Sequence, residues 1–225
     1  MPTMAEFDYQ WANLLSKHLY LNEANYKRFL DLVQLPPEWF EGKTCLDVGC
    51  GSGRWTWAMM QCGAKVVSID VSEEAVKICK DINPDTIQVD IMTFVGLKAD
   101  FVLCWGVLHH LPDPYAGFKK IAKWVKPGGR LHIMVYHKRG QKVYKPYRKL
   151  WPTLDHQERL TLCYDLLERY KGKHRIDLHG WWDALNPKYN WSYRPWQIRR
   201  WFWGEGFRDV RLMQRYNINM QGVKK

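Results

Sequence analysis

The 225-residue sequence lacks the features that would place it in a membrane-spanning or disulfide-stabilised class. No apolar run approaches the roughly 18 residues that a spanning helix requires, so no membrane partner is expected. The first ten residues hold neither a basic region nor an apolar stretch, which argues against a secretory signal. The six cysteines form no C-x-x-C pair. Disulfide and zinc sites are therefore not predicted, and a reducing, cytoplasmic location is expected.

Two nucleotide-binding motifs are also missing, and acidic residues are scarce. The sequence contains no G-x-x-x-x-G-K-[ST] string, which excludes a P-loop, and no G-x-G-x-x-G dinucleotide fingerprint. Lys and Arg number 34 against 23 Asp and Glu, which gives a formal net charge of +11. Such a positive field favours anionic partners but says nothing about the fold.

Short apolar strands alternate with helices through the middle of the chain. Strands are expected at 44–48, 64–69, 86–89, 100–105 and 130–136, and helices at 55–61, 72–80 and 114–125. This alternation predicts a doubly wound α/β fold with a mostly parallel sheet. Right-handed crossovers then bring the C-terminal ends of the strands to one edge, where ligands bind.

The pattern changes at both ends of this region. Residues 1–40 are predicted to form an N-terminal helical cap. Residues 138–194 interrupt the alternation as a long insertion after strand five. A helix at 195–203 and strands at 207–213 and 216–220 follow, the last of them antiparallel to the others. The length fits one domain, residues 1–225.

A glycine-rich loop, Asp47-x-Gly49-x-Gly51-x-Gly53, joins the first strand to a helix. Glycines there allow the backbone to turn sharply and to approach a ligand closely. The helix N-terminus supplies unpaired N–H groups. The loop therefore predicts a nucleotide-type site.

Two aspartates at the next strand ends are candidates for the same site. Asp70 ends the second strand, where its carboxylate can accept hydrogen bonds from both hydroxyls of a ribose. Asp90 ends the third strand and can accept one from an adenine amino group, with Ile91 or Met92 packing against the ring. Each aspartate alone is equally consistent with a loop or helix-capping residue. Their register with the glycine loop favours the ligand role.

Four strings in order resemble motifs of the class I S-adenosylmethionine-dependent methyltransferase family, of the type that acts on small molecules. They are residues 46–54, 68–72, 106–114 and 126–131. The resemblance implies S-adenosylmethionine as donor, S-adenosylhomocysteine as product and a seven-stranded sheet of order 3-2-1-4-5-7-6. Together with the strand-end pattern it predicts the cofactor-binding residues Asp47, Gly49, Gly51, Gly53, Asp70, Val71, Asp90, Ile91 and Trp105.

The insertion at 138–194 is predicted to lie on the acceptor side. It holds 13 Lys or Arg against six Asp or Glu, together with many Trp and Tyr residues. Three interpretations remain open. The segment is a helical subdomain with an aromatic core and a solvated basic face, a lid over an anionic small molecule, or an RNA-binding surface on which aromatic rings stack with bases.

Candidates for chemistry at the acceptor are His110, Asp183 and Tyr193. Of the pair His109 and His110, one is expected to face the acceptor and the other to fix the loop. Asp183, Pro187 and Tyr189 resemble a segment of some small-molecule and glycan-tailoring methyltransferases, which often carry histidine where this chain has Tyr193.

Other side chains are expected to support these candidates. Tyr189 is expected to face the acceptor, and Arg148 or Arg194 to neutralise an anionic group. Trp105, and more weakly Trp11 or Tyr20, could hold a sulfonium by cation–π contact. No cluster has metal-ligand spacing, so no metal is predicted.

The sequence thus predicts an enzyme that transfers a methyl group from S-adenosylmethionine to a small polar or anionic molecule. Oxygen is the expected accepting atom on chemical grounds rather than from any residue. Two alternatives remain: an RNA (tRNA) methyltransferase that uses the basic insertion, and a non-catalytic donor-binding regulatory protein. Steep salt dependence of RNA binding would identify the former. The sequence does not predict the oligomeric state.

Overall fold

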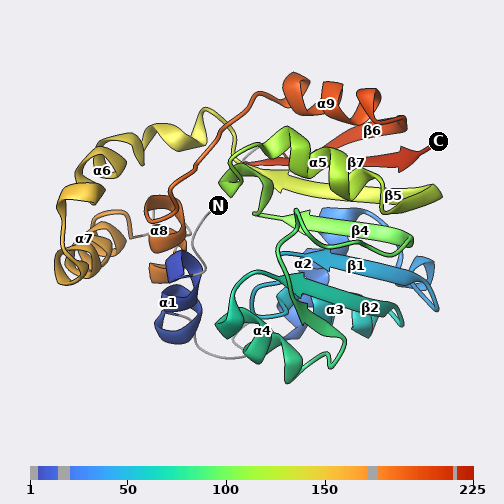
Figure 1. Cartoon of the computed structure of the whole chain (residues 1–225), viewed down its shortest axis with the longest axis horizontal. Coiled ribbons are helices and arrows are strands. Elements are labelled where there is room, and N and C mark those ends of the chain that lie inside the picture. The colour runs from blue at the N-terminus through green and yellow to red at the C-terminus, as the bar shows by residue number, and fades with distance from the viewer. Residues whose placement is uncertain (1–4, 15–20, 172–176, 215–216) are drawn as a thin grey trace.

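A computed structural model of the chain shows a seven-stranded sheet of order β3-β2-β1-β4-β5-β7-β6 (Figure 1). It describes residues 5–14, 21–171, 177–214 and 217–225. The strands are β1 Thr44–Val48, β2 Lys65–Asp70, β3 Thr86–Gln88, β4 Ala99–Trp105, β5 Val125–Val135, β6 Phe207–Gln214 and β7 Ile218–Lys224. β7 runs antiparallel to both β5 and β6, and the remaining pairs are parallel. The predicted fold class and strand order are confirmed.

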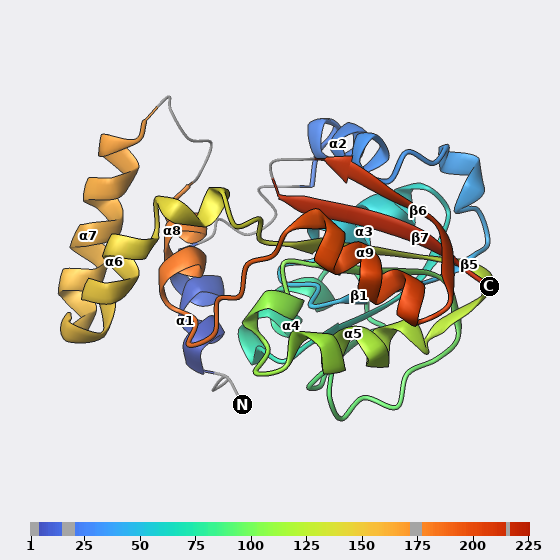
Figure 2. The same ribbon diagram turned by 90° about the horizontal axis from the view of Figure 1, so that it is seen from above.

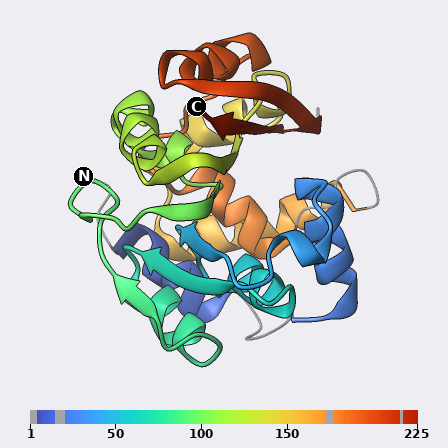
Figure 3. The same cartoon turned by 90° about the vertical axis from the view of Figure 1, so that its right-hand side faces the viewer.

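Helices cover both faces of the sheet (Figure 3). α2 (Glu23–Val33) and α3 (Arg54–Gln61) pack on one face, where Phe29, Phe40 and Phe101 are at most 1% exposed. α4 (Glu73–Lys80) lies beside α3. α5 (Pro114–Ala122) and α9 (Pro195–Gly204) pack on the other face around a second aromatic cluster. Both cores are apolar, and their packing positions the strand ends that carry the site.

Capping residues begin two of these helices, α4 and α5, at the positions expected from the sequence. Ser72 caps α4 by accepting a hydrogen bond from the Ala75 N–H, as predicted. Asp113 caps α5, and Pro114 occupies its first turn, where a missing N–H costs nothing.

The end of α5 differs from the prediction. The helix stops at Ala122 rather than near residue 125. The segment at 126–129, expected only to stop the helix, lies within β5. The pairing of β4 with β5 shifts register there, so the extra residues form a bulge.

A third unit stands beyond the C-terminal ends of the strands (Figures 1 and 2). It contains α6 (Lys145–Leu150), α7 (His156–Arg169), α8 (Leu178–Leu185) and α1 (Ala5–Asn13). Trp151, Trp181 and Trp182 are at most 4% exposed in its core, and Tyr9 and Leu14 of the α1 region pack against them. The aromatic core expected from the first interpretation of the insertion is therefore present.

The N-terminal forty residues are divided between two layers. α1 packs with the third unit, whereas α2 packs on the sheet. In the described part of the chain, no helix combines the length and apolarity needed to cross a membrane.

Candidate active site

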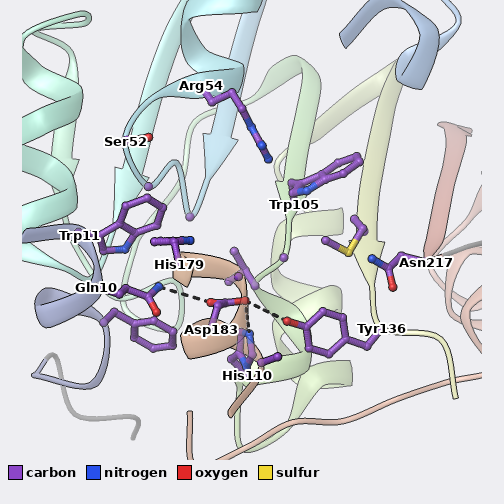
Figure 4. Close-up of a pocket in the computed structure, with 18 of the residues that line it drawn as sticks. Gln10, Trp11, Ser52, Arg54, Trp105, His110, Tyr136, His179, Asp183 and Asn217 are labelled. Atoms are coloured by element: carbon purple, nitrogen blue, oxygen red, sulfur yellow. Dashed lines mark hydrogen bonds and ion pairs between the residues drawn. The ribbon is translucent and has the colours of Figure 1, made fainter. Parts of the chain in front are cut away.

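A cavity of about 1320 Å³ lies between the strand ends and the third unit (Figure 4). Its walls come from the loops after β1, β2, β3 and β4, from the end of β5, and from α1, α7 and α8. Ligand pockets usually measure roughly 300–1,000 Å³. The cavity therefore has room for two small molecules side by side.

The glycine loop forms one wall of the cavity. Gly49 and Gly51 have φ of 71° and 54°, in the left-handed region. A Cβ on Gly49 would lie 2.1 Å from Val107 Cγ2, and one on Gly51 would lie 2.4 Å from the Trp11 ring. Gly53 instead begins α3, and its Cβ would meet Cys79 Sγ at 2.9 Å. Gly53 therefore serves close packing of α3 on α4 and does not line the cavity.

Asp47 does not reach the cavity, although it was predicted to contact the cofactor. Its side chain is buried beneath the loop, and its carboxylate accepts a 2.7 Å hydrogen bond from Thr56 Oγ1. Thr56 Oγ1 in turn lies 2.8 Å from Ser68 Oγ. Burial raises the pKa of Asp47 to about 7, against the opposing effect of the Thr56 hydrogen bond. The structure gives Asp47 a place in a polar network inside the fold.

Asp70 and Asp90, both predicted to bind the cofactor, line the cavity. Asp70 accepts 2.9 Å hydrogen bonds from the backbone N–H groups of Gly51 and Ser72, and burial raises its pKa. Asp90 accepts a hydrogen bond of 2.7 Å from the Met92 N–H. A carboxylate has about four acceptor sites. Each aspartate can therefore also accept from hydroxyl or amino groups of a ligand.

Apolar and aromatic side chains complete this half of the cavity. Val71, Ile91 and Trp105, which are also predicted cofactor-binding residues, line it. The Trp105 ring packs edge-on against Trp55, with 5.2 Å between centroids. Trp11 of α1 covers Gly51, a position that the sequence supported only weakly. The other weak sulfonium candidate, residue 20, lies outside the described residues.

A polar cluster lies at the other end of the cavity, centred on Asp183 of α8 (Figure 4). Its carboxylate accepts hydrogen bonds from Tyr136 Oη at 2.9 Å and from Gln10 Nε2 at 3.4 Å. His110 Nε2 lies 3.8 Å from the same oxygen that Tyr136 contacts. Burial alone would raise the pKa of Asp183, but the contact with His110 opposes burial and holds the pKa below its usual range.

The structure brings together His110 and Asp183, which the sequence offered as separate candidates, and adds Gln10 and Tyr136. Tyr136 is the last residue of predicted strand five, so its position at the ligand-binding edge of the sheet could have been predicted from the sequence. Gln10 gave no signal, because it lies 173 residues from Asp183 in the sequence.

The ring of His110 is held in one orientation. Its Nδ1 lies 3.0 Å from the Tyr189 carbonyl oxygen, which can only accept a hydrogen bond. Nδ1 therefore carries the proton, and Nε2 of the neutral ring has the free lone pair. That Nε2 is buried without a hydrogen-bond partner and faces Asp183. His110 can thus accept a proton beside a carboxylate that stabilises the resulting charge.

His109 fits the second role expected for this histidine pair. It is fully buried, and its ring stacks on Tyr136 with 3.7 Å between centroids. Burial lowers the pKa of His109 well below its ordinary value, so the ring stays neutral. His109 therefore fixes Tyr136 rather than facing an acceptor.

Several predicted acceptor residues lie elsewhere. Tyr193 and Tyr189 do not line the cavity, and the Tyr193 ring packs on Trp201 at 4.9 Å. The Arg148 guanidinium donates to backbone carbonyls at the end of α8, including that of Pro187 at 2.7 Å. Arg194 precedes α9. The physical reason is that Tyr193 completes the packing against α9 and Arg148 satisfies carbonyl groups at the end of α8.

Other cationic residues border the cavity: Arg28, Arg54 and Lys171. Lys171 pairs with Glu168 at 3.2 Å, and Arg54 lies 4.2 Å over the Trp55 ring. Among the described residues, no group of three or more His, Cys, Asp or Glu could hold a metal ion.

Comparison with known proteins shows the family to which the chain belongs. Residues 20–212 match the family model described as a methyltransferase domain. The chain belongs to this methyltransferase family. It is 35% identical over 99 residues to the ubiquinone biosynthesis O-methyltransferase of Coxiella burnetii, covering 40% of this chain and 42% of that one. The Paracidovorax citrulli protein of the same name is 32% identical over 135 residues, 56% of each chain. The chain thus spans about half the length, or less, of these curated relatives.

Solved structures share the fold of the methyltransferase. A magnesium protoporphyrin IX methyltransferase from Synechocystis with bound SAM superimposes with a TM-score of 0.59 at 16% identity, covering 97% of this chain and 95% of that one. A possible histamine N-methyltransferase from Thermotoga maritima gives a TM-score of 0.61 at 15% identity over 99% of both chains. These neighbours confirm the architecture inferred from the motifs.

Proposed function

We propose that the methyltransferase binds S-adenosylmethionine against the glycine loop and transfers its methyl group to an oxygen of a small polar molecule. The observation that carries the proposal is that one cavity holds both the glycine loop and the Asp183 cluster. The O-methyltransferase names of the curated relatives support oxygen as the accepting atom.

The residues of the first half of the cavity fit this donor. Gly49 and Gly51 allow Val107 and Trp11 to lie directly against the loop, where a Cβ would collide with them. Asp70 and Asp90 offer acceptors for ribose hydroxyls and an adenine amino group, respectively. Trp105 presents an aromatic wall suited to a cation. The donor supplies an activated methyl group on a sulfonium, so the protein contributes mainly position.

The second half of the cavity supplies the proton acceptor. His110 Nε2 can take the proton of a hydroxyl as that oxygen becomes methylated, and Asp183 stabilises the imidazolium formed. Tyr136 and Gln10 hold the Asp183 carboxylate in place through the hydrogen bonds already described. A positioned base of this kind typically contributes about 10²–10⁴-fold to the rate.

A small acceptor accounts for the insertion better than RNA does. Trp151, Trp181 and Trp182 are buried in the third unit, so they offer no stacking surface for bases. Arg28 and Lys171 border the cavity and support an acceptor that is polar or carries an anionic group. A non-catalytic regulatory role would leave the base-like geometry of His110 without a function.

The test measures donor binding and transfer separately. Calorimetry should show binding of S-adenosylhomocysteine but not NAD. Methyl-labelled donor incubated with a panel of hydroxylated small molecules, and in parallel with tRNA, should label the former only. His110→Gln should bind the donor normally and lose about 10²-fold or more in transfer. His156→Gln, which changes an exposed histidine on α7, is the matched control. Wild-type transfer by His110→Gln would refute the base role, and labelled tRNA at physiological salt would favour the RNA alternative.

A further inference from the structure

The outward surface of α9 carries large aromatic side chains that the fold does not use. Trp196, Arg199, Arg200 and Trp203 recur at i, i+3, i+4 and i+7, which places them on one side of the helix. Trp196 is 53% exposed and Trp203 is 59% exposed. The opposite side buries Ile198 and Phe202 completely in the sheet core. We call the four outward residues the α9 face.

The α9 face is positively charged. Pro195–Gly204 contains no Asp or Glu. α5 packs beside α9 through Phe118 and Phe202, whose ring centroids are 5.0 Å apart, and it adds the exposed Lys119 and Lys123. The first acid after the helix, Glu205, accepts a 3.3 Å hydrogen bond from Tyr115 Oη. Tryptophan and basic side chains therefore dominate this surface.

We propose that the α9 face docks the methyltransferase on an anionic lipid surface. Tryptophan has an apolar body and a polar N–H, and it settles at the level of lipid headgroups. Arginine side chains beside it are attracted by anionic headgroups within a Debye length of the surface. The expectation of no membrane partner rested on the lack of a spanning segment, which does not bear on docking at the surface.

Charge and shape favour lipid over other occupants. A second copy of the chain would set Arg199 and Arg200 near like charges, and each copy carries a net charge of +11. Proteins that bind single-stranded nucleic acid use a positively charged groove. α9 is an outer helix at the edge of the molecule (Figures 1 and 2), and its residues do not line the described cavity. A broad surface suits an outer helix of this kind better than a groove-bound strand does.

Vesicle cosedimentation tests the proposal. The wild-type chain should bind vesicles of phosphatidylcholine with phosphatidylglycerol, and bind pure phosphatidylcholine weakly. Raising the salt concentration should weaken binding. Each basic residue near an anionic surface contributes about a fivefold factor, so Arg199→Gln with Arg200→Gln should weaken partitioning roughly 25-fold. Trp196→Ala with Trp203→Ala should lower it by about tenfold or more.

Matched controls separate the α9 face from bulk charge and from general aromaticity. Lys27→Gln with Lys77→Gln removes two exposed positive charges from α2 and α4, away from α9. Tyr164→Ala removes an exposed aromatic ring from α7. Both should bind vesicles like the wild type.

Three results would overturn the proposal: no binding by the wild type, equal loss in the Lys27/Lys77 variant, or retained binding in both α9 variants. Concentration-dependent dimerisation or RNA binding that is lost in the tryptophan variant, without vesicle binding, would assign the face to those partners instead. Calorimetry of S-adenosylhomocysteine binding should be unchanged in every variant. Failure here therefore leaves the proposed function intact.

Discussion

Asp47→Asn should change how stability depends on pH. Burial raises the pKa of Asp47 from its ordinary value of 3.8 to about 7, with the Thr56 hydrogen bond acting in the opposite direction. Between these values the folded protein keeps a proton that the unfolded chain releases. The unfolded state binds fewer protons there, so the free energy of unfolding falls as pH rises from about 4 to about 7.

The size of the effect follows from the pKa. Each tenfold change in proton affinity is worth about 1.4 kcal/mol, so the full loss is about 4 kcal/mol. Roughly 1.5 kcal/mol of it has developed by pH 5. Asparagine carries no proton to release. The free energy of unfolding of Asp47→Asn, relative to that of the wild type, should therefore rise by about 2–3 kcal/mol between pH 5 and pH 8. The weaker, neutral hydrogen bond to Thr56 lowers the stability of the variant by the same amount at both pH values.

Urea unfolding of both proteins at pH 5 and pH 8 measures this difference. Asp165→Asn, an exposed change on α7, should follow the wild type at both values. A constant gap between Asp47→Asn and the wild type would show that Asp47 is ionised in the folded state. Calorimetry with S-adenosylhomocysteine adds a second readout. An affinity of Asp47→Asn within about threefold of the wild-type value agrees with a carboxylate buried beneath the loop. A decrease in affinity of about tenfold or more, the effect of losing one hydrogen bond to a charged group, would support the predicted contact of Asp47 with the cofactor.

Three further outcomes are expected. Asp70→Ala should lose about 1.5–3 kcal/mol, or roughly 10- to 150-fold, in S-adenosylhomocysteine affinity by calorimetry; an unchanged affinity would refute the ribose assignment. Gly51→Ala should abolish donor binding, because its Cβ would meet the Trp11 ring at 2.4 Å in a left-handed conformation. Adding Trp11→Ala to the Gly51→Ala variant should not fully restore donor binding, because the φ of 54° at position 51 remains unfavourable for alanine. Phe118→Ala should lower the free energy of unfolding by about 3–5 kcal/mol in urea, and a loss below 1 kcal/mol would contradict its place in the core.

The strand-end half of the site was predictable because its signals are local. Gly49, Gly51 and Asp70 stand next to short apolar strands, and parallel topology then brings them to one edge. Asp47 was expected at the cavity because it is close to the glycine loop in the sequence, but that argument ignored the side of the sheet on which its side chain lies. Side chains alternate along a strand, so Asp47 points away from Leu46 and Val48, toward Thr56 of α3.

The acceptor half depended on contacts between distant segments. Gln10 reaches Asp183 only because α1 packs on α8, an arrangement that no local pattern encodes. Arg148 was assigned to an anion from composition, but a guanidinium has five donors and the end of α8 exposes carbonyl oxygens. Arg148 therefore donates its hydrogen bonds to the end of α8 instead of to an anionic ligand.

One helix touches both halves of the cavity through consecutive residues. Trp11 lies over the glycine loop, and Gln10 contacts Asp183, so α1 cannot shift at one site without shifting at the other. A ligand that moves this helix at one half of the cavity would therefore change the other half as well. Linkage makes that effect reciprocal, so any factor by which the donor tightens acceptor binding is also the factor by which the acceptor tightens donor binding. The nine residues of α1 thus connect the two halves of the cavity of this methyltransferase.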